Sequence, residues 1–237
     1  MANVKINGNL FSGIKYIQVP TEVENTYAVY QHIYDGKNGE KQYLKSLIAN
    51  GSQYIDTLTK VLCPSNNYEL CLKFADTGVN KVMVVMGEEN DKITDSQFVK
   101  NGTIHRFDRV SQSTFNTNIT IGKVYEYKEV NGILYFDNEV IGEVQEKFLN
   151  REEYDTYDMF LFGKNNKGTV ETNTTFNGEI IEFYYKVEDE EIIHLYPVLD
   201  EDGVPCMYDS VKDICLYNNG TVQFGYKTQN GATIEPV

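Results

Sequence analysis

Residues 123–136 read KVYEYKEVNGILYF, and this stretch decides the fold class. Tyrosines alternate with charged residues up to Val130, and a second apolar run begins at Ile133. Between the two runs stands Asn131-Gly132, a pair that accepts positive φ at both central positions of a tight turn and so matches the twist of paired strands. The stretch therefore predicts a β-hairpin.

Strand patterns of this kind recur on both sides of the hairpin. Residues 68–75 alternate apolar and polar side chains, with Cys71 in the polar set, which is typical of a strand with one covered face. Residues 41–49 fit either a short helix or an extended lead-in. Because no helical pattern of useful length separates the strands, the sequence predicts an all-β sandwich or jelly roll. Further strands are expected within residues 53–63, 81–87, 98–110, 159–162, 179–187 and 192–199.

The first forty residues differ from the rest of the chain. Val4-Lys5-Ile6 precedes the turn pair Asn7-Gly8, and an apolar stretch ends at Pro20. Residues 35–41 are polar and glycine-rich, which is typical of a linker. We therefore predict two parts, a small N-terminal β arm at residues 1–40 and a main β domain at residues 41–237.

Composition excludes several classes of function. The chain of 237 residues carries 18 Tyr and 12 Phe but no Trp, and its net charge is −14. A surface this acidic repels phosphate backbones and anionic lipids, so we expect no nucleic-acid partner and no membrane partner. The opening residues MANVKINGNLFSG have no basic region followed by an apolar one, so no secretory signal is predicted and synthesis in a cytosol is expected.

The last sixty residues carry a resemblance to a known family. Gly178–Phe183 read G-x-I-x-x-F, Pro197–Asp209 read P-V-x-x-x-D-G-x-x-x-x-Y-D, and Asn218–Phe224 read N-x-G-T-x-x-F. Earlier, Gly51–Leu58 is similar to an opening G-x-Q-Y-I-D-T-G, with Leu58 in place of the last glycine, and Phe160–Gly168 is similar to a strand followed by an N-N-x-G loop. In this order the pieces resemble concanavalin A-like (LamG-type) jelly-roll modules over about residues 50–226.

Such modules occur in phage structural proteins and in surface proteins of gut bacteria, so the resemblance implies a β-sandwich fold and leaves several functions open. The N-terminal arm is similar to openings of proteins attached to phage capsids or tails, and virion proteins need no export signal. We therefore expect a phage virion structural protein on the virion surface, made in the cytoplasm of a bacterial host. It would be a capsid decoration or head-fibre protein, or a tail-attached one.

In this hypothesis the arm anchors the protein to the major capsid protein or to another virion protein by adding strands to it. The jelly roll projects outward, and host-surface glycans are the further partner considered. Virion decorations are commonly symmetric, so a homo-oligomer is expected. The alternatives are a carbohydrate-binding protein of bacterial origin and, behind it, a glycoside hydrolase. The apolar side chains expected to form the anchor are Val4, Ile6, Phe11, Ile14, Ile17 and Val19.

A catalytic centre is not expected. Glycoside hydrolysis needs two carboxylates on either side of the scissile bond, but Glu126 and Glu129 are out of phase on one strand and should face opposite ways. The acidic run Glu188-Asp189-Glu190-Glu191 is interpreted as a solvated hairpin tip. The sequence therefore predicts a protein that is not an enzyme, and it leaves the ligand-binding residues unassigned.

No cofactor or metal is expected either. The histidines His32, His105 and His194 lack partners at metal-binding spacing, and Cys63, Cys71, Cys206 and Cys215 match neither a zinc nor a redox motif. The cysteines are interpreted as buried apolar side chains. Asp200, Asp202 and Asp209 are conceivable Ca²⁺ ligands, but a role in turns is preferred for them.

Overall fold

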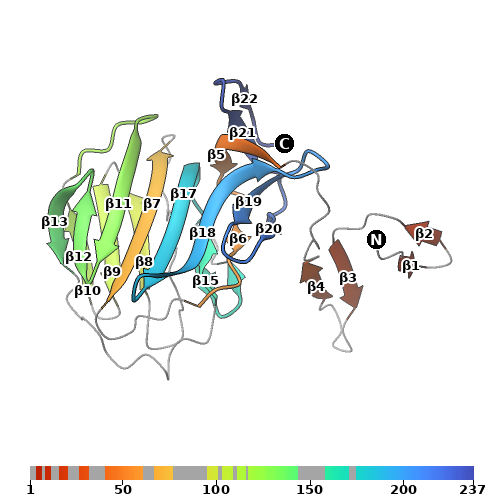
Figure 1. Ribbon diagram of the computed structural model, residues 1–237, viewed down its shortest axis with the longest axis horizontal. Helices are drawn as coiled ribbons and strands as arrows, with labels where there is room; N and C mark the ends of the chain where they lie inside the picture. Colours follow the sequence, from red (N-terminus) through yellow and green to blue (C-terminus); the bar gives the residue numbers. More distant parts are fainter. Residues whose placement is uncertain are drawn as a thin grey trace. The chain divides into compact units, whose positions relative to one another are not determined.

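A computed structural model describes residues 4–6, 9–11, 16–20, 27–31, 41–60, 67–76, 95–100, 103–108, 111–115, 117–143, 158–170 and 175–237. All regular structure in these ranges is β-strand (Figure 1). The expected all-β fold class is thus confirmed. Within the same ranges no helix is long and apolar enough to cross a membrane. The chain divides into two compact units, residues 1–38 and 39–237.

The first unit contains two antiparallel hairpins. Strand β1 (Val4–Ile6) pairs with β2 (Asn9–Phe11), and strand β3 (Tyr16–Pro20) pairs with β4 (Tyr27–Gln31). The strands of the first hairpin lie on either side of Asn7-Gly8, where the sequence predicted a turn, although the turn residues themselves lie outside the described part.

The second unit is dominated by one large antiparallel sheet. Its strands follow the order β13-β12-β11-β7-β17-β18-β5-β21-β22, and β19 and β20 continue it from β18 (Figure 1). The strands are β5 (Gln42–Asn50), β7 (Tyr68–Asp76), β11 (Val124–Val130), β12 (Ile133–Phe136), β13 (Glu139–Glu143), β17 (Asn177–Val187), β18 (Glu190–Leu199), β19 (Pro205–Asp209), β20 (Ile214–Leu216), β21 (Gly225–Thr228) and β22 (Thr233–Ile234).

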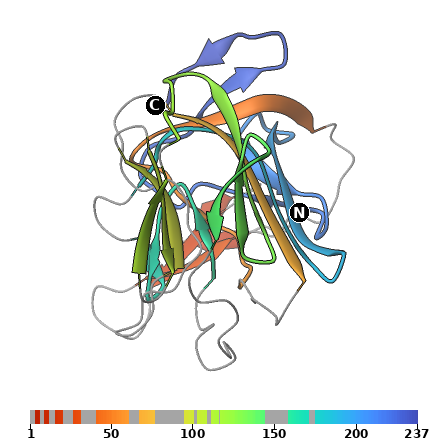
Figure 2. The same cartoon turned by 90° about the vertical axis from the view of Figure 1, so that its left-hand side faces the viewer.

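Smaller sheets form a second layer on one side of the large sheet (Figures 1 and 2). One is the antiparallel sheet β8-β9-β10, and two short pairs are β6 with β14 and β15 with β16. Gly142 on β13 shows how closely the layers approach, because a Cβ atom there would lie 2.3 Å from the Phe115 ring of β10. The strands are β8 (Asp95–Lys100), β9 (Thr103–Asp108), β10 (Ser111–Phe115), β6 (Ile55–Asp56), β14 (Phe160–Leu161), β15 (Asn165–Asn166) and β16 (Thr169–Val170).

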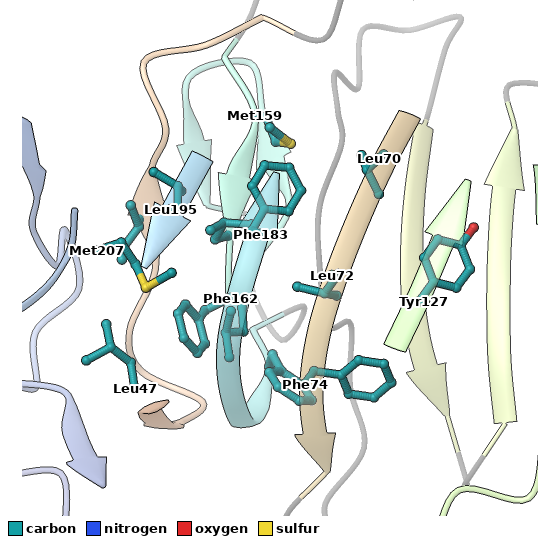
Figure 3. Packing of buried hydrophobic residues seen from close by; sticks show 14 of the residues in the cluster. Leu47, Leu70, Leu72, Phe74, Tyr127, Met159, Phe162, Phe183, Leu195 and Met207 are labelled. Carbon is teal, nitrogen blue, oxygen red and sulfur yellow. The ribbon is translucent and has the colours of Figure 1, made fainter. Parts of the chain in front are cut away.

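The hydrophobic core fills the space between the layers. Figure 3 shows its centre, where Phe183 of β17 and Leu72 of β7 lie near Phe162, which follows β14. Burying a side chain of this size stabilises the fold by roughly 1.5–3 kcal/mol. The core side chains labelled there are Leu47, Leu70, Leu72, Phe74, Tyr127, Met159, Phe162, Phe183, Leu195 and Met207.

The opening hairpin is found as predicted. Val130 of β11 pairs with Ile133 of β12, and the turn residues Asn131 and Gly132 have φ of 51° and 81°. Residues 41–49 take the extended alternative rather than the helical one, because β5 pairs with β17, β18 and β21 and its backbone is held by three neighbours.

One strand prediction is wrong in extent. Residues 53–63 were expected to form a single strand, but within residues 53–60 only Ile55–Asp56 is strand. Leu58 has a φ of 50°, which ends the extended backbone. Residues 61–63 and the strand expected at 81–87 lie outside the described part of the chain.

Candidate functional site

The large sheet has a second face, opposite the core, which we call the outer face. On β7 the side chains of Leu70, Leu72 and Phe74 enter the core, while Glu69, Cys71 and Lys73 alternate with them. The sequence predicted this division, including the unusual place of Cys71. The outer face is where polar and aromatic side chains of the sheet gather, so it is the candidate functional site.

Strand register aligns outer-face side chains into rows across the sheet. One row runs from Tyr135 through Lys128, Cys71 and Tyr184 to His194, and so crosses β12, β11, β7, β17 and β18. A neighbouring row joins Glu126 of β11, Lys73 of β7 and Glu182 of β17. Cross-strand neighbours on one face lie about 4.5–5.5 Å apart at Cβ, so the side chains in each row interact directly.

Bulges decide which acidic side chains reach this face. In β17 the register against β7 shifts between Ile180 and Glu182, so Glu179 and Glu182 both lie opposite the core although they are an odd number of residues apart. In β18 Ile192 is the extra residue against β17, and the shift brings Glu191 beside His194. A bulge re-aims a side chain in this way because two residues on one strand oppose one residue on the other.

Four ring-bearing side chains form what we call the aromatic strip, Tyr43, Tyr196, His194 and Tyr184. The rings of Tyr43 and Tyr196 meet edge to face at 6.4 Å, His194 and Tyr196 lie 4.3 Å apart, and Tyr184 lies 5.3 Å from His194. The strip crosses from β5 over β18 to β17. Tyr43 is 52% exposed, and Tyr184, His194 and Tyr196 are partly exposed, so rings remain accessible along the strip.

Charged side chains border the strip and hold one another in place. The Lys73 ammonium lies 2.5 Å from Glu182 and 3.7 Å from Glu126, and Lys128 lies 2.9 Å from Glu126. Burial opposes ionisation of Glu182, but hydrogen bonds from Lys73 and His194 outweigh it and lower the pKa of the carboxyl. The hydrogen bond to Glu182 raises the pKa of Lys73. This pair is therefore fully charged at neutral pH.

His194 stands between two carboxylates at the centre of the site. Its Nε2 lies 2.9 Å from Glu182 Oε1, and its Nδ1 lies 3.3 Å from Glu191 Oε2. The Tyr196 hydroxyl also contacts Nδ1 at 3.2 Å. These contacts fix the imidazole plane, so the ring is a rigid part of the aromatic strip.

The hydroxyl of Tyr184 is held within the protein, because it donates a hydrogen bond to Glu69. Burial and this hydrogen bond raise the pKa of Tyr184, and burial raises the pKa of Cys71 next to it to about 12. Cys71 is fully buried, as the sequence interpretation of the cysteines expected. The Cys71 thiol and the Tyr184 hydroxyl are therefore held within the protein, and the ring of Tyr184 is the part that remains accessible on the outer face.

The structure separates the carboxylates weighed in the sequence. Glu126 is on the outer face and Glu129 is buried on the core side, where the Tyr68 hydroxyl donates to it, so the two face opposite ways as predicted. Glu188 and Asp189 form the tip of the β17–β18 hairpin, with φ of 49° and 67°. Glu190 and Glu191 depart from the tip interpretation, because β18 already begins at Glu190.

Two of the aspartates considered as Ca²⁺ ligands, Asp200 and Asp209, hold turns. Asp200 Oδ1 accepts the backbone N–H groups of Asp202 and Val204, and its other oxygen accepts the Tyr217 hydroxyl. Asp209 Oδ1 accepts the N–H groups of Val211 and His194. In the described ranges no three His, Cys, Asp or Glu side chains are grouped as a metal site would require.

The residues expected to form a virion anchor lie in the first unit. Val4 and Ile6 are on β1, Phe11 is on β2, and Ile17 and Val19 are on β3. Ile14 and the side chains of this unit lie outside the described part, as do His32 and Cys63. The anchor thus stays a prediction.

Sequence reasoning did not assign the members of the aromatic strip. The available signal was the alternation in residues 182–186 and 194–196, where Tyr184, His194 and Tyr196 stand out of phase with Phe183, Ile193 and Leu195. That alternation does not show which strands lie side by side. The site depends on this arrangement, because its residues come from neighbouring strands.

Comparisons with known proteins bear on the fold. No protein-family model matches the sequence. No curated protein matches it either. Among solved structures, a candidate carbohydrate-binding protein from Bacteroides ovatus is similar, with a TM-score of 0.54 and 11% sequence identity. The match covers 81% of this chain and 62% of that one, so this chain spans less than two thirds of its neighbour. At this identity the likeness shows a shared β-sandwich fold.

Proposed function

We propose that the protein binds carbohydrate through the outer face of its large sheet. The observation that carries the proposal is the aromatic strip, in which partly exposed rings lie beside carboxylates and ammonium groups that are already held in position. Sugar rings have apolar faces that pack on aromatic side chains and hydroxyls that need both donors and acceptors. The structural neighbour, described as a candidate carbohydrate-binding protein, supports the same assignment.

We further propose binding without catalysis. A hydrolytic general acid needs a carboxyl whose pKa is raised so that it holds a proton at neutral pH. Glu182, the carboxylate most central to the face, has the opposite shift, because Lys73 and His194 stabilise its charged form. Lys73 also lies between Glu182 and Glu126 and occupies the space where a scissile bond would have to sit.

A glycan array followed by calorimetry with the best oligosaccharide tests the proposal. Tyr196→Ala removes the ring at the middle of the strip and is expected to weaken binding by roughly tenfold or more, the equivalent of about 1.4 kcal/mol. Ile234→Ala serves as the control, because it removes an exposed apolar side chain from β22 of the same sheet. Equal affinity of Tyr196→Ala and the unaltered protein would contradict the proposal.

The attachment of this binding face to a phage particle is a separate proposal, supported by the sequence resemblance and by the division of residues 1–38 into their own compact unit. In it the arm joins the capsid or tail, and the main domain presents the outer face to host glycans. Cryo-electron microscopy of purified particles tests the assignment. Strands β1 to β4 in contact with a virion protein would support it, and absence of the chain from particles would overturn it.

A further inference from the structure

The charges of the outer face are balanced within the face itself. Five lysines of this face have a carboxylate within 4 Å, which comes from the same strand, from a neighbouring strand or from a turn. The pairs are Lys41 with Asp213, Lys73 with Glu182, Lys128 with Glu126, Lys186 with Glu191 and Lys227 with Glu179. At these five positions a negatively charged ligand therefore meets an ammonium group that already has a carboxylate partner.

From this balance we infer that the site selects neutral glycans over acidic ones, and that Glu182 sets the preference by neutralising Lys73. The inference rests on the proposed function and names the class of its ligand. Glu182 is suited to the role because it is 17% exposed and contacts both Lys73 and His194. It thus holds the Lys73 ammonium next to His194, a member of the aromatic strip.

A sugar hydroxyl and a sugar carboxylate meet this arrangement differently. A hydroxyl can donate to Glu182 and accept from Lys73 without separating them, because it is both donor and acceptor. The carboxylate of a uronate can only accept, so it would have to displace Glu182 from Lys73 and leave a half-buried carboxylate without its partner. The net charge of −14 adds long-range repulsion toward any acidic polymer.

The decisive variant is Glu182→Gln, which keeps the size of the side chain and removes the nearer of the two carboxylates beside Lys73, leaving Glu126 at 3.7 Å shared with Lys128. Binding is measured to a neutral oligosaccharide taken from the array and to an oligogalacturonate of the same length. The unaltered protein is expected to bind the neutral chain only. Glu182→Gln is expected to gain affinity for oligogalacturonate by roughly tenfold.

Glu139→Gln is the matched control, because it removes the same charge from an exposed position on the edge strand β13. Thermal denaturation confirms that both variants fold. Oligogalacturonate bound as tightly as the neutral chain by the unaltered protein would overturn the inference and leave carbohydrate binding intact. The inference is overturned as well if Glu182→Gln gains no more affinity for oligogalacturonate than Glu139→Gln does. Failure of the unaltered protein to bind any glycan would instead contradict the proposed function.

Discussion

The two faces of the large sheet are made from the same strands, yet different interactions hold their side chains in place. On β17, Phe183 and Tyr185 are fully buried against the second layer, while Glu182 and Tyr184, which alternate with them, belong to a polar network that water still reaches. Apolar burial tolerates small changes of position, whereas hydrogen bonds and ion pairs need defined geometry. The core face therefore carries the stability of the domain, and under the proposed function the outer face carries its specificity.

The sharpest test of that contrast places the same substitution on adjacent residues of β17. Phe183→Ala leaves a cavity in the core and is expected to lower the free energy of unfolding by about 3–5 kcal/mol. Tyr184→Ala removes a partly exposed ring and is expected to cost about 1 kcal/mol while abolishing most glycan binding. Urea denaturation and calorimetry measure the two quantities. Similar losses of stability in both variants would break the comparison.

The sequence revealed the core face better than the outer one, and the reason is physical. The alternation around Leu70, Leu72 and Phe74 and the turn at Asn131-Gly132 are local signals, so they could be read directly. The outer face depends on bulges at β17 and β18, which exist only relative to a partner strand. Glu191 was therefore assigned to a turn, although it contacts His194 in the folded sheet.

The sequence also did not show which strands are neighbours in the sheet. His194 had no partner at metal-binding spacing along the chain, and its contacts to Glu182 and Tyr184 come from the strand beside it. The abundance of tyrosine did not help, because Tyr127 and Tyr185 serve the core while Tyr184 and Tyr196 serve the site. A period of two separates the faces, but only the sheet order shows which side chains meet.

Two partly buried carboxyls sharpen the comparison, because their pKa values shift in opposite directions. Asp56 on β6 is partly buried. Its burial and the nearby Asp158 outweigh the hydrogen bond from the Leu58 N–H and the charge of Lys212, and they raise the pKa of Asp56 to about 6. A raised pKa means that its contribution to stability is fully present below the ordinary value near 3.8 and is lost as pH rises through about 6.

Asp56→Asn should therefore stabilise the protein at neutral pH, by about 1–2 kcal/mol, and the gain should disappear toward pH 4. The asparagine keeps an acceptor for the Leu58 N–H, which the Asp56 carboxyl now accepts at 2.9 Å. Urea denaturation at several pH values measures the effect, with Glu139→Gln as the control at an exposed site. A gain that does not change with pH would show that the Asp56 carboxyl is already ionised below pH 4.

Substitution of Glu182 is expected to have the smallest effect on stability, and its pH dependence is opposite to that of Asp56. Its pKa is lowered, so its contribution to stability is present above the ordinary value of 4.5 and is lost as pH falls through the lower value of the folded state. Because the pair with Lys73 is partly exposed, Glu182→Gln is expected to cost less than about 1 kcal/mol at pH 7. In urea denaturation the difference from the unaltered protein should vanish below the folded-state pKa.

A small cost of this kind is what the proposed binding site requires. A large loss of stability in Glu182→Gln at pH 7 would mean that Lys73 and Glu182 hold the sheet together. The outer face would then contribute to stability as the core does. A small loss that depends on pH, together with a change in glycan preference, would mean that the pair is kept for recognition. The stability and the glycan preference of Glu182→Gln together thus test whether the outer face contributes to recognition and the core face to stability.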